Sequence, residues 1–533
     1  MKVFCFFFEK KKQKTFVHFV PHRHRGTAIG IIGVWDMSEP CELTAVKARA
    51  LIGRKKLSPV ELLESCIAQI EAVDPAVNAM VARDYEGARA GAKAAEAAVM
   101  SGAALGALHG LPVGIKDLSA TKGLRTTWGS PIFAQHVPTE DAGFVRRIRA
   151  AGGIILGKTN TPEWGAGANT RNSVYGATGN PFNPVLSCAG SSGGSAVALA
   201  TDMVPLASGS DMGGSLRNPA GFCGIVGFRP TPGAVPSETR GLGWSGLGVE
   251  GPMGRNVADT CLLMSVMASD DAGDPLATTV YGKTVRAPGD FYPAAGIDLA
   301  SIRAAFTPDF GFTPTERLIR ESFAEKTGLF RGLFGRAEDA SPDCSGTNEA
   351  FEVLRSVGYL TTQLERYRTR PQDIGPNIRV NVEEGLRYSG ADIARAQETQ
   401  TQIYRRWQSF FRDHDVIITP TITLSPRPWR ELYPAEIDGV PTRTYFHWLS
   451  LAYAVTVPGH PAVSLPVGLD RNGMPFGLQI VGPRGGDAFV LAVAAALEAA
   501  LAGDARTARP VPDIARLKTA SPISAMPNFI GFD

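Results

Sequence analysis

Two runs rich in glycine and serine lie close together in the chain. Residues 189–195 read AGSSGGS and residues 208–215 read SGSDMGGS. Glycines let the backbone turn so that successive N–H groups point at one spot, which is what a developing oxyanion needs. A serine at the end of such a run, such as Ser215, is a candidate nucleophile that needs a proton acceptor. Lys116 follows a short apolar run, where burial lowers the pKa of an ammonium group, so a neutral lysine can accept that proton through an intervening serine.

A second interpretation of the first run is a nucleophile elbow. Gly190-x-Ser192-x-Gly194 fits the G-x-S-x-G pattern, with Ser192 as nucleophile and His460 downstream as base. The elbow needs a hydrophobic strand immediately before it, and residues 183–188 do not form an apolar run. We therefore interpret His460 as a structural histidine in a turn.

A phosphate-binding loop is a further pattern match. Gly152 and Gly157-Lys158-Thr159 have the spacing G-x-x-x-x-G-K-T. The intervening residues 154–156 are apolar and favour a strand over a loop that cradles phosphate. We expect this match to be accidental.

The composition is that of a soluble globular chain, with 533 residues, 44% hydrophobic and 20% charged. A net charge of +3 gives no field suited to a phosphate backbone, so nucleic acid is not an expected partner. Seven widely spaced cysteines without a C-x-x-C pair suggest neither a disulfide framework nor a zinc site. We expect buried free thiols, a cytoplasmic location, and no membrane span, since the longest apolar stretch is too short.

Residues 1–36 differ from the rest of the chain because they are basic and contain a phenylalanine-rich run. They lack the ordered basic, apolar and small-residue layout of a signal peptide. We expect 1–36 to be an unstructured extension and 37–533 to form a single domain.

Helix and strand patterns alternate beyond Met37. Ser58, Pro59 and Glu61 supply an N-cap, a first-turn proline and a capping box for an amphipathic helix. This alternation predicts an α/β fold with a mostly parallel sheet. The expected strands are 77–82, 111–115, 154–156 and 416–420, with helices at 85–100, 144–151 and 488–501, a helical insertion at about 290–415, and a hairpin of 463–469 and 476–481.

Three motifs in order resemble the amidase signature family. Residues 111–117 are similar to its lysine motif, 190–195 to its bridging-serine loop and 211–217 to its nucleophile motif. Segments 157–163, 224–231 and 251–253 also fit, so the resemblance covers most of residues 40–500. Ala189 and Gly254 stand where the family more often has glycine and alanine.

The resemblance implies a fold and a set of roles. The fold would be a large mixed central β-sheet covered by α-helices on both faces. Ser215 would attack the carbonyl, Ser191, behind a cis peptide from Gly190, would relay the proton, and Lys116 would accept it. The backbone N–H groups of Met212, Gly213, Gly214 and Ser215 would form the oxyanion hole, with Ser192, Asp211 and Arg217 in support.

The implied function is hydrolysis of a small carboxylic acid amide to acid and amine or ammonia, without metal or cofactor. Homodimers are common in the resembling family. Three alternatives stay open: a carbamate or ester hydrolase with the same triad, a glutamine-hydrolysing amidotransferase subunit, and a non-catalytic binding protein.

Aromatic residues in 300–450 are candidates for an apolar substrate pocket that favours aryl or longer acyl amides. Aromatic side chains at helical spacing are also typical of a core. The candidates are Tyr359, Trp407, Trp429, Tyr445, Phe446 and Trp448.

Overall fold

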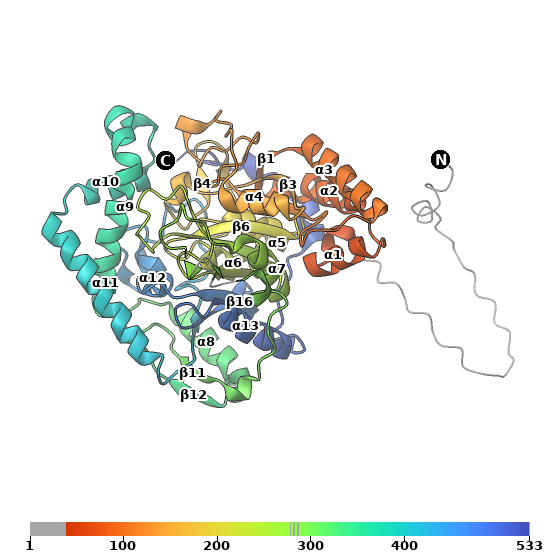
Figure 1. The fold of residues 1–533 in the computed structure, drawn as a ribbon. Coiled ribbons are helices and arrows are strands. Elements are labelled where there is room, and N and C mark those ends of the chain that lie inside the picture. Colours follow the sequence, from red (N-terminus) through yellow and green to blue (C-terminus); the bar gives the residue numbers. More distant parts are fainter. Residues whose placement is uncertain (1–38, 278, 281–282, 285–286, 532–533) are drawn as a thin grey trace, which may run out of the picture. The chain divides into compact units, whose positions relative to one another are not determined.

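One large mixed sheet organises the chain in the computed structural model, which describes residues 39–277, 279–280, 283–284 and 287–531 (Figure 1). The predicted extension 1–36 lies outside the described residues. From Glu39 onward the described chain forms one compact unit. The sheet has 11 strands in the order β1-β3-β2-β6-β8-β7-β16-β17-β13-β11-β12. Its strands are β1 (Met80–Arg83), β2 (Pro112–Lys116), β3 (Ile154–Thr159), β6 (Leu206–Asp211), β7 (Val226–Arg229), β8 (Val249–Gly254), β11 (Arg303–Phe306), β12 (Arg336–Asp339), β13 (Val416–Pro420), β16 (Ala462–Leu469) and β17 (Pro475–Val481).

The remaining strands form three small two-stranded sheets among the described residues, and the helices pack around the large sheet. The small sheets pair β4 (Arg171–Asn172) with β5 (Gly176–Ala177), β9 (Thr279–Val280) with β10 (Lys283–Thr284), and β14 (Glu436–Ile437) with β15 (Val440–Pro441). The helices are α1 (Ala45–Gly53), α2 (Pro59–Val77), α3 (Tyr85–Ser101), α4 (Gly143–Ala150), α5 (Gly193–Ala200), α6 (Arg217–Cys223), α7 (Val257–Met267), α8 (Arg317–Phe330), α9 (Thr347–Thr369), α10 (Pro376–Gly385), α11 (Gly390–Phe410), α12 (Ser450–Thr456), α13 (Asp487–Leu501) and α14 (Ile514–Thr519).

The sheet is mixed, as the resemblance implied, and the expectation of a mostly parallel sheet is wrong. Strand β2 runs parallel to β3 and β6, and β11 runs parallel to β12 and β13. The middle of the sheet is antiparallel, because β8 and β7 return beside β6 and the β16–β17 hairpin follows them. The alternation of helices and strands along the chain shows only which elements follow one another. It does not show that some strands will pair antiparallel in the sheet.

Local signals place most element ends correctly. The Ser58 side chain accepts from Val60 N and the Glu61 carboxylate accepts from Ser58 N, which forms the expected capping box of α2. This helix continues to Val77 and ends at Asn78 in the left-handed region, so the strand expected at 77–82 begins later, at Met80.

The segment at about 290–415 is not purely helical. It holds α8 to α11, but it also contributes β11 and β12, which extend one end of the large sheet beside β13. Two alanines of β11 are fully buried. These strands are short, and their apolar content is too low for the sequence pattern to separate them from the neighbouring helices.

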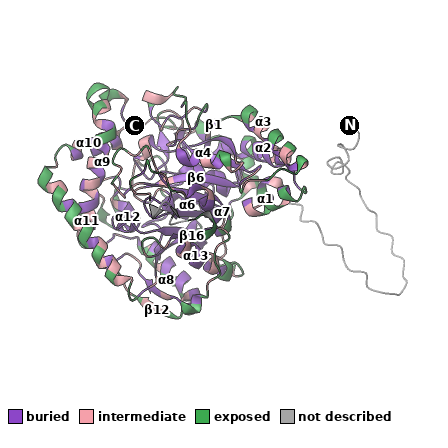
Figure 2. Ribbon diagram, viewed as in Figure 1, coloured by how far each residue is buried: buried purple, intermediate pink, exposed green. Residues whose placement is uncertain are grey.

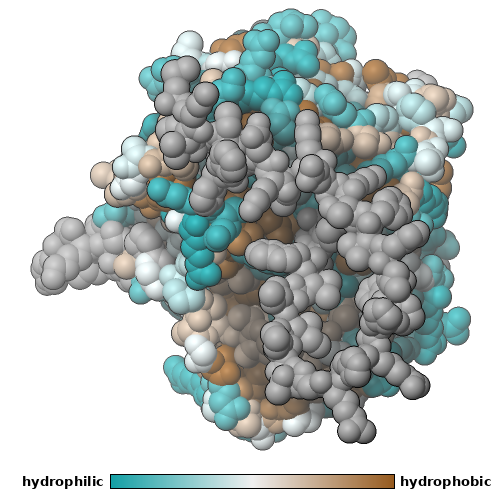
Figure 3. All heavy atoms as spheres, turned by 90° about the vertical axis from the view of Figure 1, so that its right-hand side faces the viewer, coloured by the Kyte–Doolittle hydropathy of each residue, from teal (hydrophilic) through white to brown (hydrophobic). Residues whose placement is uncertain are grey.

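Burial follows the distance from the large sheet (Figure 2). Every residue of α5 and α6 is buried, whereas α9 and α11 expose polar faces. On the face shown in Figure 3, hydrophilic residues cover much of the periphery and hydrophobic residues gather in the lower middle.

The six described cysteines are buried free thiols, as expected. None of the described helices is long and apolar enough to cross a bilayer.

The sheet brings the candidate site residues to one edge. Strands β2 and β6 are parallel neighbours, with Val113 opposite Leu206. Their carboxyl ends, which carry Lys116 and Asp211, therefore lie at the same edge of the sheet, where α/β proteins commonly bind ligands. Helix α5 packs on both strands and begins directly after Ser192.

Leu478 offers a test of the sheet core. It is fully buried in β17, so Leu478→Ala removes apolar burial and leaves a cavity that destabilises the fold by about 2–5 kcal/mol. The free energy of unfolding in urea measures this loss. Leu469→Ala, at a position on β16 that is 41% exposed, is the control and changes stability little. Equal unfolding midpoints for both variants would contradict this packing.

Candidate active site

Lys116 ends β2 with its side chain fully buried among serine hydroxyls. Its Nζ donates to Ser191 Oγ at 2.7 Å, to Ser192 Oγ at 2.9 Å and to Ser210 Oγ at 2.9 Å. An ammonium group has three N–H donors, which these hydroxyls accept. A neutral amine has two N–H groups and a lone pair, so one hydroxyl can instead donate to it. Ser210 was not among the sequence-based candidates, although it lies within the second glycine-serine run.

Burial sets the protonation of this group. It lowers the pKa of Lys116 well below the ordinary lysine range, although the negative charges of Glu250 and Asp211 oppose the shift. Glu250 lies opposite Ser210 across the β6–β8 ladder, and burial raises the pKa of its carboxyl. Its Oε2 is buried and has no hydrogen-bond partner among the described residues. Sequence reasoning missed Glu250 because only the pairing of β6 with β8 brings it to the site.

The bridging-serine loop has the expected backbone. The Gly190–Ser191 peptide is cis, as the resemblance implied. Ser192 N donates to Ser215 O at 3.2 Å, which ties this loop to the second run. Gly194 must be glycine, since a Cβ there would lie 2.2 Å from Asn160 N.

Asp211 holds the second run in place. Its carboxylate accepts from Gly214 N at 3.0 Å and from Leu216 N at 3.1 Å. Arg217 Nη2 and Arg229 Nη1 donate to Oδ1 of the same carboxylate at 2.8 and 3.1 Å. Burial alone would raise the pKa of Asp211, but the two guanidinium groups outweigh it and hold the pKa below its usual range. Arg217 was expected in this role, and Arg229 was not.

The backbone of the second run supplies fewer N–H groups than the sequence suggested. Gly214 N donates to Asp211, so this N–H is already used. Among the described residues, no hydrogen bond engages the N–H groups of Met212, Gly213 and Ser215. Gly214 has a φ of +104°, and a Cβ there would lie 2.4 Å from Ala452 Cβ, so glycine is required for shape.

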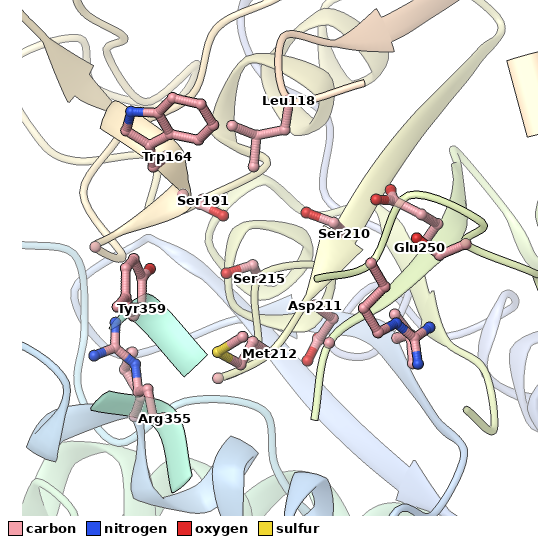
Figure 4. Close-up of a pocket in the computed structure, with 18 of the residues that line it drawn as sticks. Leu118, Trp164, Ser191, Ser210, Asp211, Met212, Ser215, Glu250, Arg355 and Tyr359 are labelled. Atoms are coloured by element: carbon pink, nitrogen blue, oxygen red, sulfur yellow. The ribbon is translucent and has the colours of Figure 1, made fainter. Parts of the chain in front are cut away.

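A cavity of about 240 Å³ opens beside these groups. Figure 4 shows the hydroxyls of Ser191, Ser210 and Ser215 around a common space. Its other lining side chains include Leu118, Met212, Trp164, Glu250, Arg355 and Tyr359. Trp164 stacks on Trp128 with ring centroids 5.4 Å apart.

The expected aromatic pocket is correct for two of its six residues. Tyr359 and Tyr445 line the cavity. The other four do not line it and make packing contacts or hydrogen bonds instead. Trp407 packs against Phe310 and His460, Trp429 belongs to a small separate cluster with Ala177 and Ile523, Trp448 Nε1 donates to Tyr445 O, and Phe446 packs on Phe351.

The two rival patterns have structural explanations. His460 is fully buried, with Nδ1 2.8 Å from Gly482 O and Nε2 3.2 Å from Gln408 Nε2. It has no hydrogen bond to Ser192. The phosphate-loop match falls on β3, whose residues Ile154–Thr159 are all buried in the sheet. Within the described ranges, no group of three or more His, Cys, Asp or Glu side chains is placed to hold a metal ion.

Comparison with known proteins agrees with these motifs. The amidase family profile matches residues 61–491. An acylamidase of Rhodococcus erythropolis is 33% identical over 460 residues, covering 86% of this chain and 95% of the relative. A glutamyl-tRNA(Gln) amidotransferase subunit of Acidothermus cellulolyticus is 32% identical, with 87% and 95% covered.

Solved structures show the same relationship. A bacterial aryl acylamidase of the amidase signature enzymes superposes with a TM-score of 0.79 at 29% identity, covering 86% of this chain and 96% of that chain. The superposition thus extends over most of both chains. This chain belongs to the amidase family, the amidase signature family that its motifs resemble.

Proposed function

We propose that this amidase hydrolyses carboxylic acid amides with Ser215 as nucleophile, Ser191 as proton relay and Lys116 as base. The observation that carries the proposal is the fully buried Lys116 Nζ, which lies 2.7 Å from Ser191 Oγ. Ser191 and Ser215 both line the cavity. A buried amine whose pKa is lowered is available in its neutral form, which is the form that accepts a proton.

The reaction then proceeds in two halves. Ser215 Oγ forms a bond to the amide carbon while its proton passes to Ser191 Oγ, and the Ser191 proton passes to Lys116 Nζ. When the C–N bond breaks, the proton returns through Ser191 to the leaving nitrogen, which departs as amine or ammonia. Water attacks the acyl-enzyme by the same route and releases the acid and Ser215.

The negative charge that develops on the carbonyl oxygen needs preorganised donors. The N–H groups of Met212, Gly213 and Ser215 suit this role because no described residue accepts from them. Gly214 N–H, which the resemblance would include, is engaged by Asp211, so we assign Gly214 a conformational role. Ser192 and Ser210 hold the amine of Lys116 in place.

The cavity walls favour amides with an aryl or longer apolar group. Trp164 and Tyr359 line the cavity beside Ser215 and also a second cavity of about 200 Å³. Leu242 and Leu354 add apolar surface there. Relatives named acylamidase and aryl acylamidase are consistent with this substrate class.

A glutamine-hydrolysing amidotransferase subunit is the second candidate, because several relatives at 31–33% identity are such subunits. It predicts glutamine turnover and obligate partner proteins. Carbamates and esters are further substrates that the same groups can process. The cytoplasmic location and the homodimer stay predictions.

The nucleophile can be identified by mass. After exposure to phenylmethylsulfonyl fluoride, intact-protein mass spectrometry is expected to show one adduct, absent in Ser215→Ala, because the reagent reacts with an activated serine. In Lys116→Ala the adduct forms about 10²–10⁴ times more slowly, which is the usual contribution of a general base. An adduct that persists in Ser215→Ala and maps to Ser192 would support the elbow mechanism instead.

The pH dependence tests the state of Lys116. Only the neutral amine accepts a proton, so the rate of Ser215 labelling rises with pH as Lys116 deprotonates. Because burial lowers its pKa, the rise levels off well below the ordinary lysine value of ~10.4. Glu250→Gln removes a charge that favours the ammonium form and moves the rise to lower pH, while the exposed control Glu140→Gln leaves it in place. A rate that keeps rising beyond the ordinary lysine pKa would refute this account.

Substrate size gives a separate test. We expect kcat/KM for acetanilide and butanoyl-4-nitroanilide to exceed that for acetamide by at least about 10-fold, since burying an aryl group contributes roughly 1.5–3 kcal/mol. Release of amine or ammonia measures the three rates. Faster turnover of acetamide would overturn the assignment of the apolar walls, and turnover of glutamine alone would support the amidotransferase candidate.

A further inference from the structure

Arg355 is a buried cation in the wall of the active-site cavity. It comes from α9 and is only 5% exposed, yet it lines the same cavity as Ser191 and Ser215. Figure 4 shows its guanidinium beside Tyr359, with Glu250 on the far side of Ser215. The position raises the question of what balances its charge.

Its neighbours are neutral. Nη1 donates to Asn381 Oδ1 and Nη2 donates to the Tyr445 hydroxyl. The guanidinium lies over the rings of Tyr359, Tyr445 and Phe446, at 5.0, 4.7 and 4.7 Å from their centroids. These two hydrogen bonds use two of its five N–H groups, and the Tyr359 hydroxyl is a further hydrogen-bond partner of the guanidinium. Aromatic rings attract a cation but do not cancel its charge.

Among the described residues, no carboxylate lies within 4.0 Å of Arg355. Glu384 acts on it only through space, and its own carboxylate accepts from Ser356 Oγ at 3.2 Å. Burial lowers the pKa of Arg355, but a guanidinium group keeps its proton at neutral pH. The charge is therefore present, and no carboxylate of the described residues contacts it directly.

Three other buried arginines contact a carboxylate directly. Arg217 and Arg229 share the Asp211 carboxylate, and Arg255 pairs with Asp202. Arg240, which also lines the cavity, lies 3.5 Å from the Asp274 carboxylate. A buried charge is expensive unless an opposite charge or a ligand pairs with it. Arg355 lines the cavity that contains the candidate nucleophile, so an anionic group of a bound substrate could pair with it.

We propose that Arg355 binds a carboxylate of the substrate, so that the preferred amides carry one carboxylate on either the acyl or the amine side of the scissile bond. The planar guanidinium fork matches a carboxylate. The inference rests on the proposed function, because it names the substrate class of that same site. It makes Arg355 a specificity-determining residue.

Matched substrate pairs test the proposal. On the acyl side, succinic acid mono-4-nitroanilide is compared with butanoyl-4-nitroanilide, and on the amine side 4-acetamidobenzoate is compared with 4-methylacetanilide. Each pair exchanges a carboxylate for a methyl group. In one pair the carboxylate is expected to raise kcat/KM by about 10- to 100-fold, as charge-assisted hydrogen bonds do. The pair in which the carboxylate raises kcat/KM shows whether Arg355 binds the acyl side or the amine side of the substrate.

Variants separate recognition from structure. Arg355→Met is expected to abolish the preference by raising KM for the anionic substrate, with a much smaller change in KM for its neutral partner. Arg355→Lys keeps the charge and retains part of the preference. Arg368→Met, at an exposed position of the same helix, is the control and keeps the full preference.

The outcomes are distinct from those of the proposed function. If wild-type protein labels at Ser215 but turns over neutral substrates as well as or better than anionic ones in both pairs, the carboxylate proposal is wrong and the amidase mechanism stands. Equal losses on both members of a pair in Arg355→Lys would make Arg355 structural, and would also overturn it. If Arg355→Met does not fold, the wild-type ratios and Arg355→Lys decide. Absence of labelling at Ser215 would count against the proposed function itself.

Discussion

The removal of Lys116 from water is the condition on which the active centre depends. The side chain ends a buried strand, and three serine hydroxyls at 2.7–2.9 Å replace the water that an exposed ammonium would bind. Hydroxyls can accept from an ammonium or donate to an amine, so the same cage fits both protonation states. A carboxylate in direct contact would hold the proton on nitrogen. Glu250, one of the two acids whose charge acts on Lys116, is itself buried, and its pKa is raised.

Asp211 is also a buried ionisable group, but direct ion pairs stabilise its charge. It is as buried as Lys116, but Arg217 and Arg229 contact its carboxylate and keep it ionised. Its acceptor capacity then fixes the backbone of the run that carries Ser215, through Gly214 N and Leu216 N. In the proposed mechanism Lys116 changes its charge during the reaction, while Asp211 stays ionised and holds the backbone around Ser215 in place. Preorganisation of donors around a nucleophile needs both.

The wall that faces the substrate comes from a different part of the chain than the reacting groups. Helix α9 contributes Tyr359 and Arg355, and the short 3-10 helix Glu163–Gly165, which follows β3, contributes Trp164. Three of the aromatic residues that the sequence offered for this wall, Trp407, Trp429 and Trp448, instead fill the interior. A large aromatic side chain contributes most when it is fully buried, so its presence near a site in sequence says little about whether it borders the cavity.

The sequence by itself supplied the candidate reacting groups and several local element ends. Ser215 and Lys116 are candidates because of their residue types and motifs, and Ser191 is added by the resemblance to the family. The N-terminal cap of α2 and the turn of the β16–β17 hairpin follow from rules that act over a few residues. Tertiary structure alone decided that Arg229 shares Asp211, that Glu250 faces Ser210, and that Arg355 lines the cavity with no carboxylate of the described residues in contact with it. These contacts join segments far apart in the chain, and no periodicity or local propensity encodes which strands become neighbours or which buried charge meets its counterion.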